Sequence, residues 1–333
     1  ETEKIRQMEQ MRDEMSEAKR QLGSMAGRIG NLSQELERFG VFLAQQLNGE
    51  VVSADSMQIY RHLTVGTAKP TPQEMQGIPH HLIDFLEPGQ SFSVAEYVQL
   101  ARQEIQEIVQ RGKLPVLVGG TGLYISSLVD NIQFSESQGD PKLREQLRQY
   151  AQENGPQALW ERLQAVDSQA AQRIHPNNIG RVARALEVYQ TTGKTISEHQ
   201  ELSRQQPSPY RLCMMALSFR DRQKLYDRIN LRVEQMLEQG LLDEARWLRD
   251  HQVDARSLQA IGYKELQAYL DGQEELQQAV ERIQQETRRY AKRQLTWFRR
   301  DERYRFFLAE DFADRESMHR QMAQFAREQL QLS

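Results

Sequence analysis

Three glycines and a threonine, Gly119-Gly120-Thr121-Gly122, lie between a continuously apolar segment and the start of an amphipathic helix. Glycine lets the backbone approach a bound group closely, and the free N–H groups at a helix start attract anions. Thr121 adds a hydroxyl to the same turn. This segment is the best candidate in the chain for a phosphate-binding turn, and a tight strand-to-helix turn without a ligand is the alternative.

A second polar group follows the apolar run at residues 51–54, namely Asp55-Ser56-Met57-Gln58. Open α/β sheets bind ligands at the carboxyl ends of their strands, where Asp55 could accept a proton or hold a metal ion. Capping of the next turn by the same side chain is the alternative. The loop Gly66-Thr67-Ala68-Lys69-Pro70 carries one cation, which is compatible with phosphate contact and equally with solvent exposure.

Basic residues gather late in the chain. Between Glu281 and Arg305 there are nine Lys or Arg residues against four acidic ones. On a helix these cations form two adjoining rows, and Ile283, Tyr290 and Trp297 recur every seven residues beside them. Such a stripe is either a solvated face or a surface that binds the phosphates of a nucleic acid.

Several other sites are excluded. The single cysteine, Cys213, excludes an intrachain disulfide and a cysteine-based zinc site. His80-His81 has no companion at metal-ligand spacing, so both histidines are expected to be structural. Gly193-Lys194-Thr195 resembles the end of a P-loop, but the upstream glycine is replaced by Val188, which indicates a helix end instead.

Composition sets the general class. The chain has 333 residues, a formal net charge of −4 and 38% hydrophobic residues, which is enough for about two globular domains. No apolar run approaches the ~18 residues of a membrane span, and the charged start is unlike a signal peptide. We therefore expect a soluble, cytoplasmic protein without a membrane partner, in which any nucleic-acid site is a local basic surface.

From about Val51 onward, short apolar runs alternate with amphipathic helices, which predicts an α/β fold with a parallel sheet. Strands are expected near 51–54, 78–84, 115–118, 211–218 and 305–308. Helices are expected from Ser93 to Gly112, from Leu123, near 221–239, 241–250, 257–270 and 274–299, and at the carboxyl end. Between 131 and 208 the pattern indicates helices alone, as in an inserted helical domain.

The first 42 residues follow a heptad pattern. Its a positions are Met8, Met15, Leu22, Ile29, Leu36 and Leu43, and its d positions are Met11, Ala18, Met25, Leu32 and Phe39. A coiled coil that joins two chains is the favoured interpretation, because a single helix cannot bury this seam. One long helix folded back on the globular part is the alternative.

Eight motifs occur in an order that resembles the bacterial tRNA dimethylallyltransferases, also called isopentenyl-tRNA transferases. The resemblance covers about residues 43–310. The motifs are Asp55-Ser56-Met57-Gln58-Ile59-Tyr60, Gly66-Thr67-Ala68-Lys69-Pro70, Pro79-His80-His81-Leu82-Ile83-Asp84, Val118-Gly119-Gly120-Thr121-Gly122-Leu123-Tyr124, His175-Pro176-Asn177-Asn178, Arg184-Ala185-Leu186-Glu187, Ile261-Gly262-Tyr263-Lys264-Glu265 and Lys292-Arg293-Gln294-Leu295-Thr296-Trp297-Phe298.

This resemblance implies a P-loop-NTPase-like parallel sheet. The α/β catalytic core would comprise residues 43–130 and 209–333, the helical tRNA-binding insertion residues 131–208, and the coiled-coil-like helix residues 1–42. The implied reaction transfers a dimethylallyl group from dimethylallyl diphosphate to the exocyclic N6 amine of the adenine 3′ of the anticodon. The implied partners are the anticodon stem-loop of tRNA and the diphosphate, with Mg²⁺ sharing the diphosphate charge. The adenine must leave its stack to reach the donor.

The resemblance also assigns site residues. Asp55 is the implied general base, Thr121 lines the substrate channel, and Arg232 stabilises the leaving pyrophosphate. Gly119, Gly120 and Gly122 would bind the diphosphate, and no metal ligand is assigned. The implied tRNA contacts are Asp55, Ser56, Met57, Gln58, Thr121, Arg144, Gly180, Arg181, Val182, Ala183, Arg184, Gln259, Ala260, Ile261, Gly262, Tyr263, Lys264, Lys292, Arg293, Gln294, Leu295, Thr296, Trp297, Phe298 and Arg299.

One motif of the family is absent. The family begins with a strand and a glycine-rich P-loop ending in Gly-Lys-Thr, which should fall at the positions of Glu35-Leu36-Glu37. Two acids thus replace the residues that would meet the diphosphate. A catalytically impaired tRNA-binding or coiled-coil interaction protein, self-associating through residues 1–42, is therefore the alternative function.

Overall fold

The computed structural model describes residues 32–132, 134, 140–204, 207–251, 253 and 259–332. The heptad positions from Met8 to Ile29 lie outside the described residues. The described chain forms two compact units, one up to Ile125 and again from Leu212, the other Ser126–Arg211.

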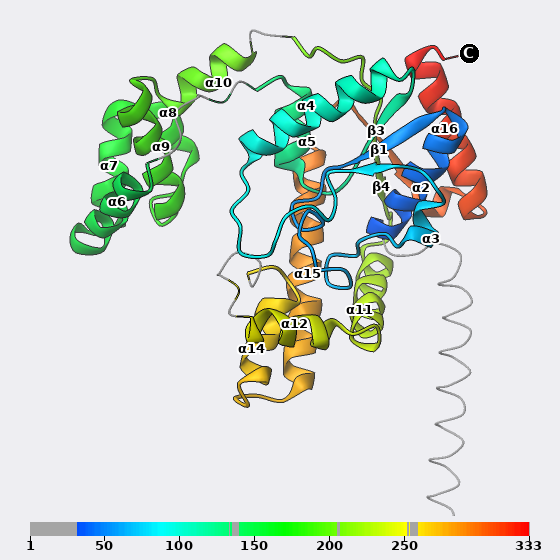
Figure 1. Ribbon diagram of the computed structural model, residues 1–333. Coiled ribbons are helices and arrows are strands. Elements are labelled where there is room, and N and C mark those ends of the chain that lie inside the picture. Colours follow the sequence, from blue (N-terminus) through cyan, green and yellow to red (C-terminus); the bar gives the residue numbers. More distant parts are fainter. Residues whose placement is uncertain are drawn as a thin grey trace, which may run out of the picture. The chain divides into compact units, whose positions relative to one another are not determined.

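The first unit contains the strands and most of the long helices (Figure 1). Its strands are β1 (Gly49–Ser53), β2 (His80–His81), β3 (Leu114–Val118), β4 (Met214–Ser218) and β5 (Tyr304–Leu308). Its helices are α2 (Leu32–Gln46), α3 (Pro72–Met75), α4 (Val94–Gln110), α11 (Arg222–Glu238), α12 (Leu241–Asp250), α14 (Tyr263–Leu270), α15 (Leu276–Phe298), the short η1 (Ala309–Asp311) and α16 (Arg315–Leu330). Helix α5 (Gly122–Val129) crosses into the second unit.

All strand pairs in the described chain are parallel. β1 lies between β2 and β3, and β4 pairs with β5 in a separate two-stranded sheet. This confirms the predicted α/β class and the approximate position of every predicted strand. Ser53 is level with Val118 in the register, so β1 and β3 end at the same edge of their sheet.

Helix α2 packs on the sheets of its own unit. Phe39, Leu43 and Ala44 are at most 6% exposed and share one core with Val118 and Leu217. Burial of an apolar side chain of this size contributes about 2 kcal/mol. The part of the heptad pattern within α2 is therefore used inside the unit, as in the folded-back alternative, and the predicted boundary at residue 42 falls within this helix.

Helix α4 shows how the sequence fixes an element of this unit. Ser93 caps its start in a capping box with Glu96, and Tyr97, Val98 and Ala101 form its buried face. Arg111 ends the helix before Gly112, which has a positive φ of 71°. The capping residue and the buried face agree with the prediction from sequence.

A second core anchors the segment that follows β1. Ile59 and Leu63 from this segment are buried with Leu241, Tyr263 and Ile283 from α12, α14 and α15. The helices late in the sequence thereby hold the residues that come directly after the candidate base Asp55.

The second unit is helical, as the pattern of residues 131–208 predicts. Leu159, Leu163, Val182 and Ala183 have no exposed surface and form its core. Its helices are α6 (Pro141–Asn154), α7 (Pro156–Val166), α8 (Ser168–Arg173), α9 (Ile179–Thr192) and α10 (Ile196–Arg204). Gly193 follows α9 in the left-handed region with a φ of 71°, which confirms the predicted helix end.

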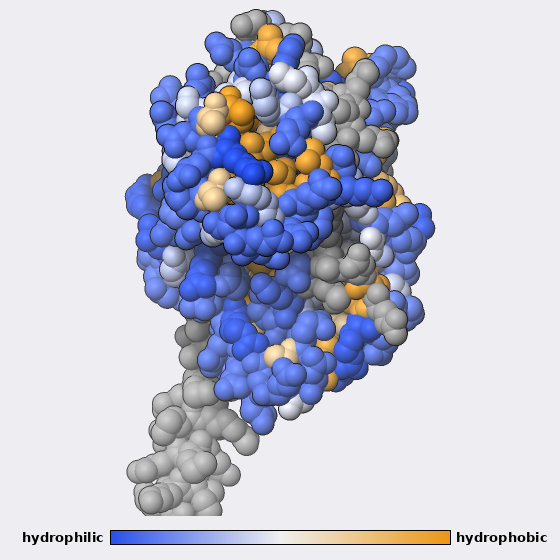
Figure 2. Space-filling view, turned by 90° about the vertical axis from the view of Figure 1, so that its left-hand side faces the viewer, coloured by the Kyte–Doolittle hydropathy of each residue, from blue (hydrophilic) through white to orange (hydrophobic). Residues whose placement is uncertain are grey.

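The surface is mainly hydrophilic on the face drawn in Figure 2, where hydrophobic side chains gather in limited areas. Among the described helices, none combines the length and the hydropathy that a bilayer crossing requires.

Glu50 is the main buried charge of β1. Its carboxylate accepts hydrogen bonds from Arg111 and His81, each at 2.7 Å, and pairs with Lys113 at 2.8 Å. Burial by itself would raise the pKa of Glu50, but its bonds to Arg111, Lys113 and His81 hold the pKa at about 2. The charged form is therefore strongly favoured in the folded chain.

We predict that Glu50→Gln lowers the free energy of unfolding at pH 7 by about 3 kcal/mol, because the substitution breaks a buried ion-pair network. In the wild type, the ionised Glu50 carboxylate stabilises the fold at a pH above its unfolded pKa near 4.5. This stabilisation is lost as the pH falls towards 2. Urea unfolding between pH 7 and pH 2 should show a shallower acid dependence for the variant. Equal pH dependence of the two proteins would contradict this assignment.

Candidate active site

Asp55 stands two residues after the end of β1 and is half-buried. Its Oδ1 accepts the backbone N–H groups of Met57 at 2.8 Å and Gln58 at 3.3 Å. Burial raises the pKa of Asp55, although these two hydrogen bonds oppose the shift. The predicted turn cap and the predicted base are thus the same side chain: Oδ1 holds the turn, and Oδ2 has no hydrogen bond to the described residues.

Thr121 joins the turn after β3 to the turn after β1. Its Oγ1 accepts the backbone N–H of Ser56 at 3.0 Å, and its own N–H donates to the carbonyl of Ala54 at 3.1 Å. Gly119 makes this approach possible, because a Cβ at that position would lie 2.5 Å from the Ala54 carbonyl oxygen. The structure therefore brings together the two segments that the sequence singled out for chemistry.

Helix α15 closes the same turn from another direction. The Gln294 side chain donates a hydrogen bond to the Gly120 carbonyl at 2.8 Å. A Cβ on Gly122 would lie 2.4 Å from the indole ring of Trp297. The glycines of this turn are thus explained by the close approach of α15, and not by ligand binding alone.

Tyr290 is a site residue that the sequence showed only as a member of the seven-residue pattern with Ile283 and Trp297. Burial, followed by the nearby charge of Asp55, raises the pKa of Tyr290 to about 12. Burial, then Tyr124 and the charge of Asp55, raise the pKa of Tyr97, whose ring stacks on Tyr124 with centroids 4.0 Å apart. An aromatic environment around Asp55 was not predicted.

Glu37 is the buried acid of this region, at 7% exposure. Burial, then the charges of Asp55 and Glu74, raise its pKa to about 7 although the Gln58 amide opposes the shift. Its Oε2 has no hydrogen-bond partner and lies 4.0 Å from His80 Nε2, which is also buried and unpartnered in the described chain. A buried carboxyl group with a raised pKa therefore stands where the resemblance implies a P-loop threonine.

Arg232 lies in α11 and is buried at 7% exposure. Its guanidinium donates to the Gln239 side chain at 3.0 Å and to the Val65 carbonyl at 3.4 Å, while Nε has no partner among the described residues. Burial lowers the pKa of Arg232. The arginine makes no hydrogen bond to Asp55 or Thr121, so the described contacts connect it to the loop at Val65 and not to the candidate base.

The loop around Lys69 differs from its prediction. Lys69 is 8% exposed, and its ammonium donates to the Tyr60 carbonyl and to the Asp84 carboxylate. Lys69 is therefore neither exposed to solvent nor available to a phosphate, because its ammonium group is already bonded to Tyr60 and Asp84. Glu244 accepts the N–H groups of Val65 and Gly66, and the Tyr263 hydroxyl donates to Glu244 at 2.8 Å.

The implied tRNA stretches of the first unit divide into exposed and buried residues. Gln58, Gly262 and Tyr263 are buried and hold loops, and Leu295 packs beside Phe219. The exposed members lie on the last turns of α15, with Trp297 at 40% exposure, and in the segment 259–264. They are Gln259, Lys264, Lys292, Arg293, Thr296, Trp297 and Arg299.

In the second unit, some of the residues that the resemblance implies as tRNA contacts are buried. Val182 and Ala183 have no exposed surface because they form the apolar face of α9. Arg144 donates two hydrogen bonds of 2.8 Å to buried Glu187, and Arg184 pairs with the same carboxylate at 3.1 Å. Gly180 and Arg181 are exposed, and Arg184 is half-exposed with one partner.

No resident metal site is visible in the described residues: they contain no group of three or more His, Cys, Asp or Glu side chains suited to a metal ion. Magnesium usually keeps several waters and binds through few carboxylates together with substrate phosphates. These residues therefore do not fit a Mg²⁺ ion held by protein side chains alone.

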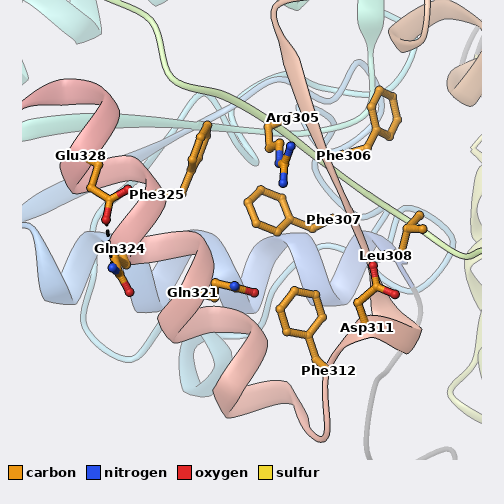
Figure 3. Close-up of a pocket in the computed structure, with 10 residues that line it drawn as sticks. All are labelled: Arg305, Phe306, Phe307, Leu308, Asp311, Phe312, Gln321, Gln324, Phe325 and Glu328. Carbon is orange, nitrogen blue, oxygen red and sulfur yellow. Dashed lines mark hydrogen bonds between the residues drawn. The ribbon is translucent and has the colours of Figure 1, made fainter.

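A cavity of about 510 Å³ lies elsewhere, on β5 and α16 (Figure 3). Phe307, Phe312 and Phe325 form its apolar wall, and Arg305 and Phe306 also line it. It contains none of the residues predicted to bind substrate.

We predict that Glu37→Gln raises the free energy of unfolding at pH 8 by about 2 kcal/mol. The wild-type carboxyl keeps its proton up to about pH 7 when folded and loses it near pH 4.5 when unfolded. Wild-type stability therefore falls as the pH rises through this window. Urea unfolding at pH 5 and pH 8 should show the gain only at pH 8. The exposed control Glu316→Gln should change neither value, and an unchanged pH dependence in Glu37→Gln would contradict the buried proton.

Comparison with known proteins supplies the family. The sequence profile described as IPP transferase matches residues 58–301. The tRNA dimethylallyltransferase of Thermoanaerobacter sp. (strain X514) is 46% identical over 300 residues, covering 89% of this chain and 95% of that protein. The corresponding protein of Bacillus licheniformis is 50% identical over 272 residues, covering 81% of this chain and 86% of that protein.

Solved structures agree with these relatives. The tRNA isopentenylpyrophosphate transferase of Bacillus halodurans is 44% identical with a TM-score of 0.66, covering 91% of this chain and 97% of that one. A eukaryotic dimethylallyltransferase acting on tRNA is 30% identical with a TM-score of 0.68, covering 81% of this chain and 68% of that one. By sequence and by structure, the chain belongs to the IPP transferase family of tRNA dimethylallyltransferases.

Proposed function

We propose that this chain transfers a dimethylallyl group from dimethylallyl diphosphate to the N6 amine of the adenine 3′ of the tRNA anticodon. One observation carries the proposal: Asp55 and the 119–122 glycine turn meet at the common edge of β1 and β3. The substrates are those of the family. Asp55 and the glycine turn are the groups at this edge that the reaction needs.

Asp55 is the proposed general base. The adenine amine attacks the C1 carbon of the dimethylallyl group, and the C1–O bond breaks with its electron pair leaving on the diphosphate. The proton released from the amine nitrogen goes to Asp55 Oδ2. Because burial raises the pKa of Asp55, its carboxylate is a stronger base than an exposed aspartate would be.

The glycine turn and α15 are proposed to hold the two substrates. The turn at Gly119–Gly122 lies at the start of α5, where free N–H groups favour an anionic group. The exposed Lys292, Arg293 and Trp297 lie on the helix that contacts this turn. Cations that bind RNA phosphates and a ring that stacks on a base would therefore lie close to the donor.

In the second unit, Gly180 and Arg181 are the proposed tRNA contacts, since their neighbours Val182 and Ala183 are buried. Arg232 is proposed to face the leaving pyrophosphate when the donor is bound. Its partly unpartnered guanidinium would supply charge-assisted hydrogen bonds there. Mg²⁺ is proposed to arrive with the diphosphate.

A second function is favoured by one observation, the acids at the start of α2. Glu35 is fully buried against Arg315, and Glu37 is buried beside Asp55. Carboxyl groups in this position would disfavour a diphosphate. A protein that binds tRNA without turnover is therefore the alternative.

We predict that Asp55→Asn lowers the rate of prenyl transfer by about 10²- to 10⁴-fold, the usual loss when a general base is removed. Its amide oxygen can still accept the two N–H groups of the turn, so the fold should remain unchanged and tRNA affinity should fall far less than the rate. Mass spectrometry of nucleosides from digested tRNA measures the product, and filter binding measures affinity.

The control is Asp243→Asn, because this aspartate is 80% exposed on α12. This variant should leave both the prenyl-transfer rate and the tRNA affinity unchanged. Wild-type turnover that survives in Asp55→Asn would contradict the role of the base. Wild-type tRNA binding without any product, at enzyme equal to tRNA, would favour the binding-only function.

A further inference from the structure

Two buried polar atoms face each other between α2 and β2. Glu37 Oε2 lies 4.0 Å from His80 Nε2, and neither atom has a hydrogen-bond partner among the described residues. The Glu37 side chain is 9% exposed and that of His80 is 1% exposed. Buried polar atoms are nearly always hydrogen-bonded in folded proteins, so this pair requires an explanation.

The other ring nitrogen of His80 defines what the pair lacks. Nδ1 lies 2.8 Å from the Ile78 carbonyl oxygen, which can only accept, so Nδ1 carries the ring proton. In the neutral ring, Nε2 is then an acceptor. A carboxylate oxygen is an acceptor as well. Two acceptors therefore face each other unless one further proton lies between them.

Burial determines which group carries that proton. A carboxylate and an imidazolium are both disfavoured away from water. Burial lowers the pKa of His80. Burial, followed by the charges of Asp55 and Glu74, raises the pKa of Glu37 to about 7. Both shifts favour a neutral pair in which the Glu37 carboxyl group holds the proton.

The cations around Glu37 do not replace this proton, because they are bonded to other acids. Arg38 pairs with Glu35 and Glu74, Arg315 is bonded to Glu35, and His81 is bonded to Glu50. Strands β3 and β4 pack on α2 without any charged residue. The titratable and charged groups around Glu37 and the first turns of α2 are Glu35, Arg38, Glu50, Asp55, Glu74, His80, His81, Arg228, Arg315 and His319.

Gln58 connects the pair to the candidate base. Its side chain is hydrogen-bonded to the Glu37 carboxyl group, and its backbone N–H donates to Asp55 Oδ1 at 3.3 Å. An ionised Glu37 would thus add a second negative charge beside Asp55. We infer that Glu37 keeps a proton directed at His80, and that loss of this proton weakens the binding of dimethylallyl diphosphate. The inference rests on the proposed function for the identity of this anion.

The sign of the pH dependence follows from the protonation of Glu37. Below about pH 7 the carboxyl group is protonated and adds no charge beside Asp55. Above about pH 7 it is ionised, so the binding of an anion is coupled to the uptake of a proton. The affinity of the wild-type chain for the donor should therefore fall as the pH rises.

The variant Glu37→Gln imitates the protonated state at every pH. Its side chain has the same length, carries no charge and can donate an amide N–H to His80 Nε2. The control Glu316→Gln removes a carboxylate that is 72% exposed on α16, and it should behave as the wild type does. Because the donor phosphates also change their charge with pH, all three proteins are compared in the same buffers.

Calorimetry with dimethylallyl diphosphate and Mg²⁺ at pH 6 and pH 8.5 tests the coupling. Between these pH values, we expect the dissociation constant to rise about tenfold more in the wild-type chain than in Glu37→Gln. Titrations at pH 8.5 in two buffers of different ionisation enthalpy count the protons taken up. The wild-type chain should take up about one proton more per bound donor than the variant.

Infrared spectroscopy of the chain without donor tests the proton by itself. The spectrum of the wild type minus that of Glu37→Gln should contain the C=O stretching band of a protonated carboxyl group at pH 6 and lose it by pH 8.5. Absence of this band at pH 6 would overturn the inference, and so would equal pH dependence of donor binding in the two proteins. Donor binding by neither protein at either pH would instead contradict the proposed function, and the infrared band would still show whether Glu37 holds its proton.

Discussion

The level pairing of β1 with β3 is the constraint on which the candidate site depends. Ala54 donates to the Val118 carbonyl at 2.6 Å, and the Ala54 carbonyl then accepts the N–H of Thr121. These two bonds extend the pairing to Ala54, one residue past β1, and to Thr121, three residues past β3. Asp55 and the glycine turn are consequently held by backbone geometry and not by long side chains, which is the more rigid way to position a reacting group.

Helix α15 connects this junction to the surface. Its Gln294 is bonded to the Gly120 carbonyl, and its Trp297 packs on Gly122. The same helix exposes Lys292 and Arg293. Because these side chains share one helix, RNA bound on its exposed face, as proposed, would lie on the same element that contacts the glycine turn. This arrangement places the basic stripe beside the glycine turn although the bonded residues Gly120 and Gln294 are 174 positions apart in the chain.

Strands, helices and the outline of the site could be predicted because they depend on local pattern. The apolar run at 115–118, the cap at Ser93 and the turn residues at 119–122 each define an element through nearby residues. Burial of individual side chains in the implied binding stretches could not be predicted in this way. Val182, Ala183 and Tyr263 lie within motif-like stretches, and only tertiary packing makes them core residues.

The sequence also did not predict which charged side chains pair with each other. Lys69 and Arg144 have the residue type of phosphate ligands, but Asp84 and Glu187 already neutralise them. The heptad pattern could not distinguish a coiled coil from a helix that packs on a sheet, because the same spacing suits both. The core around Phe39 and Leu43 decides in favour of the sheet for α2. Tyr290 and Glu37 acquire their significance only from their proximity to Asp55.

The most direct test of the site is calorimetric binding of dimethylallyl diphosphate, with Mg²⁺, to the wild-type chain and to Gly120→Leu. A side chain at position 120 would displace Gln294, since its Cβ would lie 2.3 Å from the amide nitrogen. If the turn holds the donor, the wild-type chain binds it and the variant binds at least about tenfold more weakly. Absence of binding to the wild-type chain, or equal binding to both, would contradict a donor site at the edge of β1 and β3.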